Sequence, residues 1–271
     1  MTTSEPPSAS GRNPLTQQQL GEFSKRLVSE ADAIFARTQD SSQWPVQPGS
    51  SLAGDDRATD PYHLSHAVRG GISSSAEHLH AFRTLLVDAG VLHPQAAFTL
   101  LRAAIETAAG AVWLLNPPSR ATRVTRALQH AATDAKDGNQ AAEEAGADII
   151  TPLPDRLARL QDVARTAGVA ESVITARAPG STKIVDYANN DPSSAFDLLL
   201  TWRICSGIAH GRNWPRLGFL RREMTSRNAE TNVGEYRITS DWEQISWALG
   251  ASLDVLRHAC RLFDERSRVH V

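Results

Sequence analysis

The chain has 271 residues, of which 41% are hydrophobic and 21% are charged, as in an ordinary globular protein. It carries 28 basic and 30 acidic residues, and the formal net charge of −2 excludes a whole-protein positive field that would attract nucleic acid. The two cysteines, Cys205 and Cys260, lie in apolar helical patterns, so we expect buried reduced thiols rather than disulfides or metal ligands.

The N-terminal part of the chain predicts a tail, a helix and a long connection. Residues 1–14 are rich in Ser, Pro and Thr and lack apolar periodicity, so we expect a disordered tail. Residues 15–271 are expected to form a single helical domain. Apolar residues at spacings of three and four predict a first helix from Leu15 to about residue 35. The Pro- and Ser-rich residues 39–60 are expected to contain neither helix nor strand.

The middle of the chain predicts a series of helices. Asp60-Pro61 is typical of a helix start, and the helix that follows is expected to reach residue 89 with a weak point at Gly70 and Gly71. Similar patterns of apolar spacing and of terminating Pro or Gly residues predict helices over residues 93–115, 120–145 and 152–167.

The C-terminal part adds a loop, a hairpin and two helices. Residues 178–192 are expected to form a loop, and Ser193 or Ser194 to cap a helix that carries the stretch 202–211. Residues 217–224 and 235–239 predict the strands of a β-hairpin. A last helix is predicted over residues 241–266. The fold class expected is an all-α bundle of about seven helices with a small β-hairpin near residues 217–239.

The sequence also predicts the cellular location of the protein. The N-terminus lacks the basic and apolar regions of a signal peptide. The most apolar window, residues 103–115, is short for a bilayer span and contains Glu106. We therefore expect a cytoplasmic protein without a membrane partner.

The stretch 202–211 places three chemically useful groups together. At about 100° per residue, Arg203, Ser206 and His210 share one face of the predicted helix. That face combines a permanent cation, a hydroxyl group and an imidazole that titrates near neutral pH. Such a trio can bind and act on a phosphate, and it can equally form a polar seam between packed helices.

The spacing of Arg203 and His210 resembles the Arg-x(4–6)-His signature of HEPN proteins (higher eukaryotes and prokaryotes nucleotide-binding). Ser206, His210 and Gly211 resemble a Ser-x-x-x-His-Gly element of uncharacterised bacterial helical proteins. The similarity lies mainly in residues 93–271, and the apolar Ile204 departs from the polar residue that commonly follows the HEPN arginine. The resemblance implies a metal-independent endoribonuclease of toxin or defence type, acting as a homodimer and paired with an antitoxin.

The same resemblance implies that Arg203 holds the scissile phosphate and that His210 acts as general acid or base. Physical chemistry supports these roles, because a guanidinium binds phosphate bidentately and an imidazole transfers protons at neutral pH. Ser206 would support either group, and neither a cofactor nor a metal is expected. The alternatives are a catalytically silent module that binds nucleotide or RNA or dimerises, and a purely structural protein in which Arg203 and His210 bridge helices.

A second charged pair, Arg102 and Glu106, is spaced i, i+4 in the most apolar predicted helix. Burial of charge is costly unless partners are found, so we expect an ion pair that also bonds a neighbouring helix. The functional interpretation is that Glu106 supports the catalytic site by orienting His210 or Arg203.

Two arginine groups are candidates for RNA contacts. Arg120, Arg123 and Arg126 are spaced three apart, which is typical of a solvated helix face and is also compatible with a phosphate-binding strip. Arginines interleaved with Trp214 follow His210, as in clamps for single-stranded nucleic acid or in an ordinary exposed turn. The candidate phosphate or RNA contacts are Arg102, Arg120, Arg123, Arg212, Trp214 and Arg216.

Overall fold

The computed structural model describes residues 17–91, 93–191 and 194–269. The predicted disordered tail, residues 1–14, lies outside this part of the chain. The described residues form eleven α-helices and one antiparallel hairpin, which confirms the all-α bundle with a small β-hairpin. The number of helices exceeds the expected seven, because short helices occur in segments that the sequence predicts as loops.

The first six helices are α1 (Gln17–Thr38), α2 (Ser51–Thr59), α3 (Leu64–Arg83), α4 (Ala96–Leu115), α5 (Arg120–Ala145) and α6 (Leu153–Thr166). The other five are α7 (Ser172–Thr175), α8 (Ser181–Asn189), α9 (Leu198–Ala209), α10 (Asn213–Gly218) and α11 (Trp242–Ser267). The strands are β1 (Arg221–Arg227) and β2 (Gly234–Thr239), and short turns of 3-10 and π-helix occupy Ser41–Gln43 and Thr84–Asp88.

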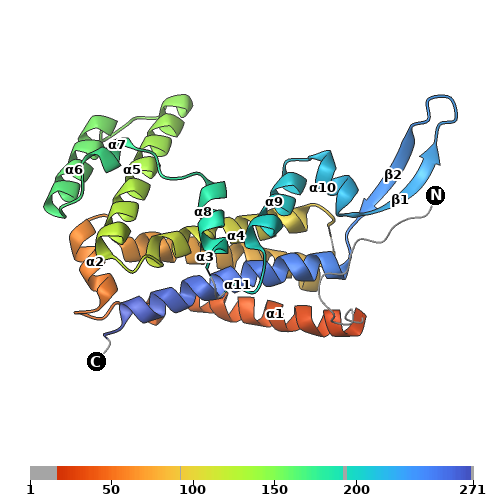
Figure 1. The fold of residues 1–271 in the computed structure, drawn as a ribbon, viewed down its shortest axis with the longest axis horizontal. Coiled ribbons are helices and arrows are strands. Elements are labelled where there is room, and N and C mark those ends of the chain that lie inside the picture. The colour runs from red at the N-terminus through yellow and green to blue at the C-terminus, as the bar shows by residue number, and fades with distance from the viewer. Residues whose placement is uncertain (1–16, 92, 192–193, 270–271) are drawn as a thin grey trace.

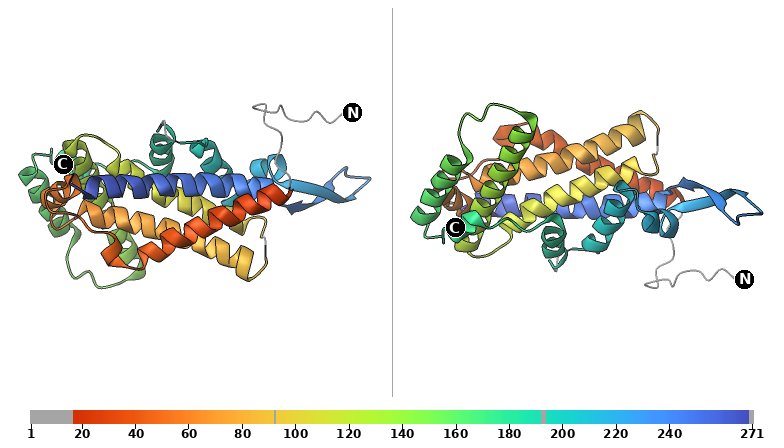
Figure 2. Two further views of the ribbon diagram at one scale, coloured as in Figure 1. Left: turned by 90° about the horizontal axis from the view of Figure 1, so that it is seen from below. Right: turned by 90° about the horizontal axis from the view of Figure 1, so that it is seen from above.

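Four long helices form the body of the molecule. Helices α1, α3, α4 and α11 lie side by side along the long axis, with α4 against both α3 and α11 (Figures 1 and 2). Helices α5, α6 and α7 cross one end of this bundle, and the hairpin β1–β2 projects from the other end (Figure 1). Helices α8 and α9 cover the outer side of α4.

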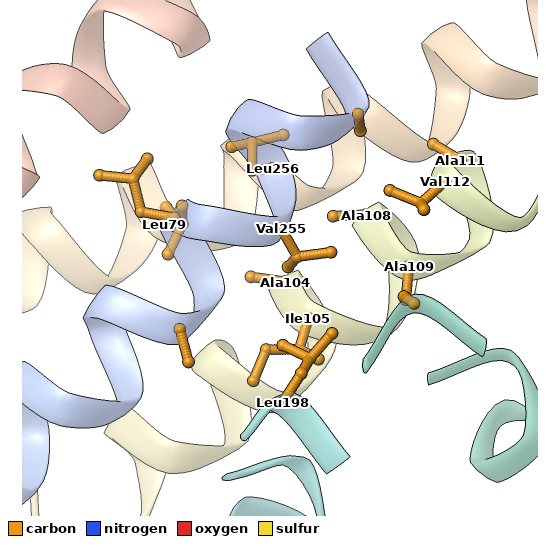
Figure 3. Close-up of a cluster of buried hydrophobic side chains, with 14 of the residues drawn as sticks. Leu79, Ala104, Ile105, Ala108, Ala109, Ala111, Val112, Leu198, Val255 and Leu256 are labelled. Atoms are coloured by element: carbon orange, nitrogen blue, oxygen red, sulfur yellow. The ribbon is translucent and has the colours of Figure 1, made fainter. Parts of the chain in front are cut away.

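The core is built around α4. Its Ala104, Ile105 and Ala108 are fully buried against side chains of α3, α9 and α11, among them Leu198 and Val255 (Figure 3). Alanines at these positions let neighbouring helices approach closely, as ridge-into-groove packing requires. By length and composition α4 is the one described helix that could span a membrane, because Ala96–Leu115 extends beyond the apolar window 103–115. Most of the helix is nevertheless buried inside the bundle.

A buried ion pair fixes the end of the bundle where α5 begins. Arg123 is 1% exposed and donates to both carboxylate oxygens of the fully buried Asp55, at 2.7 and 3.0 Å. It also donates to the carbonyl oxygens of Pro117 and Pro118, both at 2.9 Å. These bonds satisfy the guanidinium in an apolar setting and join α2 to the turn between α4 and α5.

The segment 39–60, expected to contain no helix, includes α2. Ser50 caps that helix by accepting a hydrogen bond from the amide of Ala53, and the fully buried Leu52 and Asp55 anchor it. Asp60 therefore ends α2 instead of starting the next helix, which begins at Leu64. Helix α3 then runs without interruption through the weak point predicted at Gly70 and Gly71.

The C-terminal part shows three further differences from the sequence prediction. Residues 178–192, expected to form a loop, contain α8, because Val185 and Ala188 are buried against the bundle. Helix α9 is capped by Asp197, which accepts from the amide of Leu200 at 2.9 Å, and not by Ser194, while Ser193 lies outside the described residues. Residues 217–220, predicted as part of the first strand, include the end of α10.

We expect Asp55→Ala to lower the free energy of unfolding by about 3–5 kcal/mol, because it leaves the buried Arg123 guanidinium without a counter-charge. Denaturant titration would measure the loss. The matched control is Asp162→Ala, which removes a carboxylate that is 70% exposed and paired with Arg165. That change should cost no more than about 1 kcal/mol. Equal losses in the two variants would contradict the role given to the buried pair.

Both thiols should be unreactive in the folded protein. Burial raises the pKa of Cys205 and of Cys260 to about 12, so the reactive thiolate is scarce near neutral pH. Titration with a chromogenic disulfide reagent at pH 8 should detect almost no thiol in the native state and two thiols per chain in denaturant. Rapid labelling of the native protein would show that α9 or α11 is not packed as described.

Candidate functional site

A cavity of about 680 Å³ lies beside α4, where α8 begins and α9 ends. We call it the α8–α9 cavity. Helix α4 contributes Arg102 and α5 contributes Gln129, while residues 177–183 form the wall that leads into α8. Helix α9 contributes Trp202 and Ser206, and His210 follows at its C-cap.

Glu106 lies outside the lining of this cavity and contacts three residues that line it. Its carboxylate forms an ion pair with Arg102 at 3.1 Å and accepts hydrogen bonds from the hydroxyl of Ser181 and, at 3.3 Å, from the indole nitrogen of Trp202. These three partners come from α4, α8 and α9, and all of them line the cavity. The i, i+4 ion pair and the bond to a neighbouring helix are both confirmed. Among the described contacts of Glu106, however, neither His210 nor Arg203 is a partner.

The cavity carries positive charge. Arg102, Arg177 and Lys183 line it, and none of the described lining residues is acidic. Glu106 and Asp137 pair with the two arginines from outside the lining, Asp137 with Arg177 at 2.8 Å. Lys183 is exposed and forms no ion pair within the described residues, so its charge is uncompensated.

The start of α8 adds a further positive contribution. Gly180, Ser181, Thr182 and Lys183 all line the cavity, so the first turn of the helix faces it. The amide of Lys183 donates to the carbonyl of Gly180 at 2.9 Å, whereas the amides of Ser181 and Thr182 precede the first intrahelical hydrogen bonds, and the helix dipole is positive there. No side chain of the described residues caps this end of α8. The first turn therefore reinforces the attraction that Arg102 and Lys183 exert on an anion.

Helix α9 and its C-cap contribute three residues to the cavity lining, and Arg203 is not among them. Trp202, Ser206 and His210 follow one another at intervals of four residues and form the lining stripe. Arg203 is turned by about 100° from Trp202, is exposed and does not belong to the lining. The structure thus brings Ser206 and His210 together with Arg102, and leaves Arg203 outside the cavity.

The arginines of α5 mainly form contacts that stabilise the fold. Arg123, a candidate RNA contact, is buried and bonded to Asp55, so this prediction is wrong: a phosphate cannot reach it. Arg126 donates to the carbonyl of Trp113 at 2.5 Å and lies over the Tyr187 ring at 4.3 Å. Arg120 is 55% exposed, although it also contacts Asp55 at 3.3 Å. These three residues therefore do not form a continuous basic strip.

The candidates after α9 lie on the surface around α10. Arg212 is exposed and Arg216 is partly buried. Trp214 is 56% exposed and packs against α9 at Gly207, where an added Cβ would come within 2.9 Å of the indole ring. None of the three lines the α8–α9 cavity, so any contact they make with RNA would be peripheral to it.

Sequence reasoning missed Arg177, Lys183 and the first turn of α8. The signal available was the run Gly180-Ser181-Thr182-Lys183, in which small polar residues and a lysine precede the apolar Ile184 and Val185. The prediction of a loop was instead based on the surrounding residues typical of loops, Pro179, Asn189, Asn190 and Pro192.

No group of three His, Cys, Asp or Glu side chains in the described residues is arranged to hold a metal ion. Comparison with known proteins gives no further assignment. No family model matches the chain, and neither a curated protein nor a solved structure matches it. The α8–α9 cavity therefore has to be interpreted from its own chemistry.

Proposed function

We propose that the α8–α9 cavity binds the phosphate group of a nucleotide or of RNA. The observation that carries this proposal is the convergence of Arg102, Arg177 and Lys183 on one cavity whose described lining contains no carboxylate. Guanidinium and ammonium groups form charge-assisted hydrogen bonds to phosphate oxygens. The amides of Ser181 and Thr182 at the start of α8 supply the same kind of donor.

Glu106 contributes to binding by holding the donors in place. A long arginine side chain loses rotamer freedom when it binds a ligand, and this loss weakens binding. The ion pair to Glu106 already restricts Arg102 in the unbound protein. The same carboxylate restrains Ser181 and Trp202, so the cavity keeps its shape before the phosphate arrives.

A second function, metal-independent RNA cleavage, is favoured by the position of His210 in the cavity wall. In this mechanism the imidazole removes the proton of a 2′-hydroxyl, whose oxygen attacks the adjacent phosphorus. The bond from phosphorus to the 5′ oxygen breaks, and the imidazolium returns the proton to that oxygen. The products are a 2′,3′-cyclic phosphate and a 5′-hydroxyl, and Arg102 takes the phosphate-holding role that the HEPN resemblance implies for Arg203. The HEPN resemblance, the homodimer and the antitoxin partner stay predictions.

Arg102→Ala should weaken binding of pyrophosphate and of a short oligoribonucleotide at least tenfold, or about 1.4 kcal/mol, as measured by calorimetry. Lys183→Ala should weaken it less, and it changes an exposed side chain that the fold does not need. The matched control is Arg203→Ala, which removes a neighbouring arginine outside the cavity and should leave affinity unchanged. Wild-type affinity in both cavity variants, with the fold verified by circular dichroism, would refute the phosphate site.

RNA cleavage is tested separately from binding. We expect His210→Gln to reduce cleavage of single-stranded RNA in the presence of EDTA at least a hundredfold, because removal of a general acid–base catalyst typically costs this much. The affinity of the same variant for pyrophosphate should change little, since Arg102 and Lys183 remain. Unchanged cleavage in His210→Gln would contradict catalysis by His210 and leave phosphate binding as the function.

A further inference from the structure

A second cavity, of about 500 Å³, lies between α3, α4, α5 and α8. We call it the apolar cavity. Alanine and glycine residues of α3 and α4 form half of its lining, and Trp113, Leu114 and Ile184 add further apolar surface. Its polar side chains are Glu106, Thr107 and His130. The Thr107 hydroxyl donates to the carbonyl of Ala103 at 2.9 Å, and Glu106 is bonded to three residues of the neighbouring site.

The two cavities are neighbours on three helices. Adjacent residues of α4, Arg102 and Ala103, line the α8–α9 cavity and the apolar cavity respectively. The same holds for Gln129 and His130 of α5, and for Lys183 and Ile184 of α8. Glu106 forms the shared wall, because it lines the apolar cavity and its carboxylate bonds to lining residues of the other one.

We propose that the two cavities form one ligand site, which takes a phosphate ester of a compact non-polar alcohol. The phosphate lies in the α8–α9 cavity, and the hydrocarbon or aryl group of the same molecule lies in the apolar cavity. This inference rests on the proposed phosphate site and specifies the class of ligand that binds there. One turn of α4 separates Arg102 from Glu106, a rise of about 6 Å, which matches the length of a small aryl phosphate.

The lining explains why the non-polar group is hydrocarbon rather than a nucleobase. A buried base needs hydrogen-bond partners for its ring nitrogens and exocyclic groups. Glu106 and Thr107 are already bonded within the protein, which leaves the indole N–H of Trp113 and the exposed His130 as the uncommitted polar groups in the described lining, too few for the several polar atoms of a base. Small apolar side chains instead offer a surface from which hydrocarbon displaces water favourably.

Gly110→Leu tests the inference by filling the apolar cavity. Nothing lies within 4 Å of a Cβ placed on Gly110, and leucine favours a helix more than glycine does, so the variant should fold. Gly70→Leu fills the same cavity from α3, again into open space. The matched control is Gly138→Leu on α5, where the Cβ also meets open space and neither cavity is touched.

The measurement is the affinity for phenyl phosphate and for inorganic phosphate by calorimetry. We expect the wild type to bind phenyl phosphate at least tenfold more tightly than inorganic phosphate. Gly110→Leu and Gly70→Leu should abolish this preference without changing the affinity for inorganic phosphate, and Gly138→Leu should behave as wild type. Binding of inorganic phosphate by the wild type reports on the phosphate site alone, so failure of that site is distinguishable.

Three outcomes would overturn the inference. One is equal wild-type affinity for phenyl phosphate and inorganic phosphate. Another is an undiminished preference for phenyl phosphate in both cavity-filling variants. The third is a wild-type affinity for AMP that exceeds that for phenyl phosphate and is lost in Gly110→Leu, because the apolar cavity would then be a base site.

Discussion

The need to satisfy one carboxylate in the most apolar helix shapes the site and much of its surroundings. Glu106 lies on α4, whose neighbouring positions Ala104, Ile105 and Ala108 are fully buried. The Glu106 side chain is 27% exposed, so it loses part of its hydration, and cationic and hydrogen-bonding partners compensate that loss. Arg102, Ser181 and Trp202 supply them, and in doing so they tie α8 and α9 to α4. The cavity between these helices is a consequence of that arrangement.

The contrast between Glu106 and Asp55 separates charges that border an open cavity from charges that are enclosed in the fold. Both acidic residues form an ion pair with an arginine. Asp55 is fully buried, and the N–H donors of its partner Arg123 are occupied by five hydrogen bonds within the protein. Arg102 is 26% exposed and lines an open cavity, so it keeps donors for a ligand. Exposure, rather than residue type, decides which arginine can bind phosphate.

Elements whose ends are marked by local sequence signals could be predicted from the sequence. Features that depend on contacts between residues far apart in the chain could not. Helix α5 was predicted with its observed bounds, since prolines precede it and Gly146 ends it in a left-handed conformation. Ser206, His210, Arg102 and Glu106 were likewise identified as site candidates, and the structure places them in or against the cavity. Arg123 has the spacing of a surface residue, and its burial depends on Asp55, 68 positions away. Spacing alone did not show that Arg203 is exposed and lies outside the lining, while the adjacent Trp202 lines the cavity and bonds to Glu106.

The position of α11 has a consequence for how the protein is made. Helix α11 packs along both α1 and α4, so it closes a bundle whose other three helices are finished by residue 115. A ribosome synthesises from the N-terminus, and α1, α3 and α4 therefore emerge with one apolar side uncovered until residue 267 has been added. During that interval the alanine-rich face of α4 is open to wrong partners. The unfinished chain is therefore most prone to aggregation before α11 is complete.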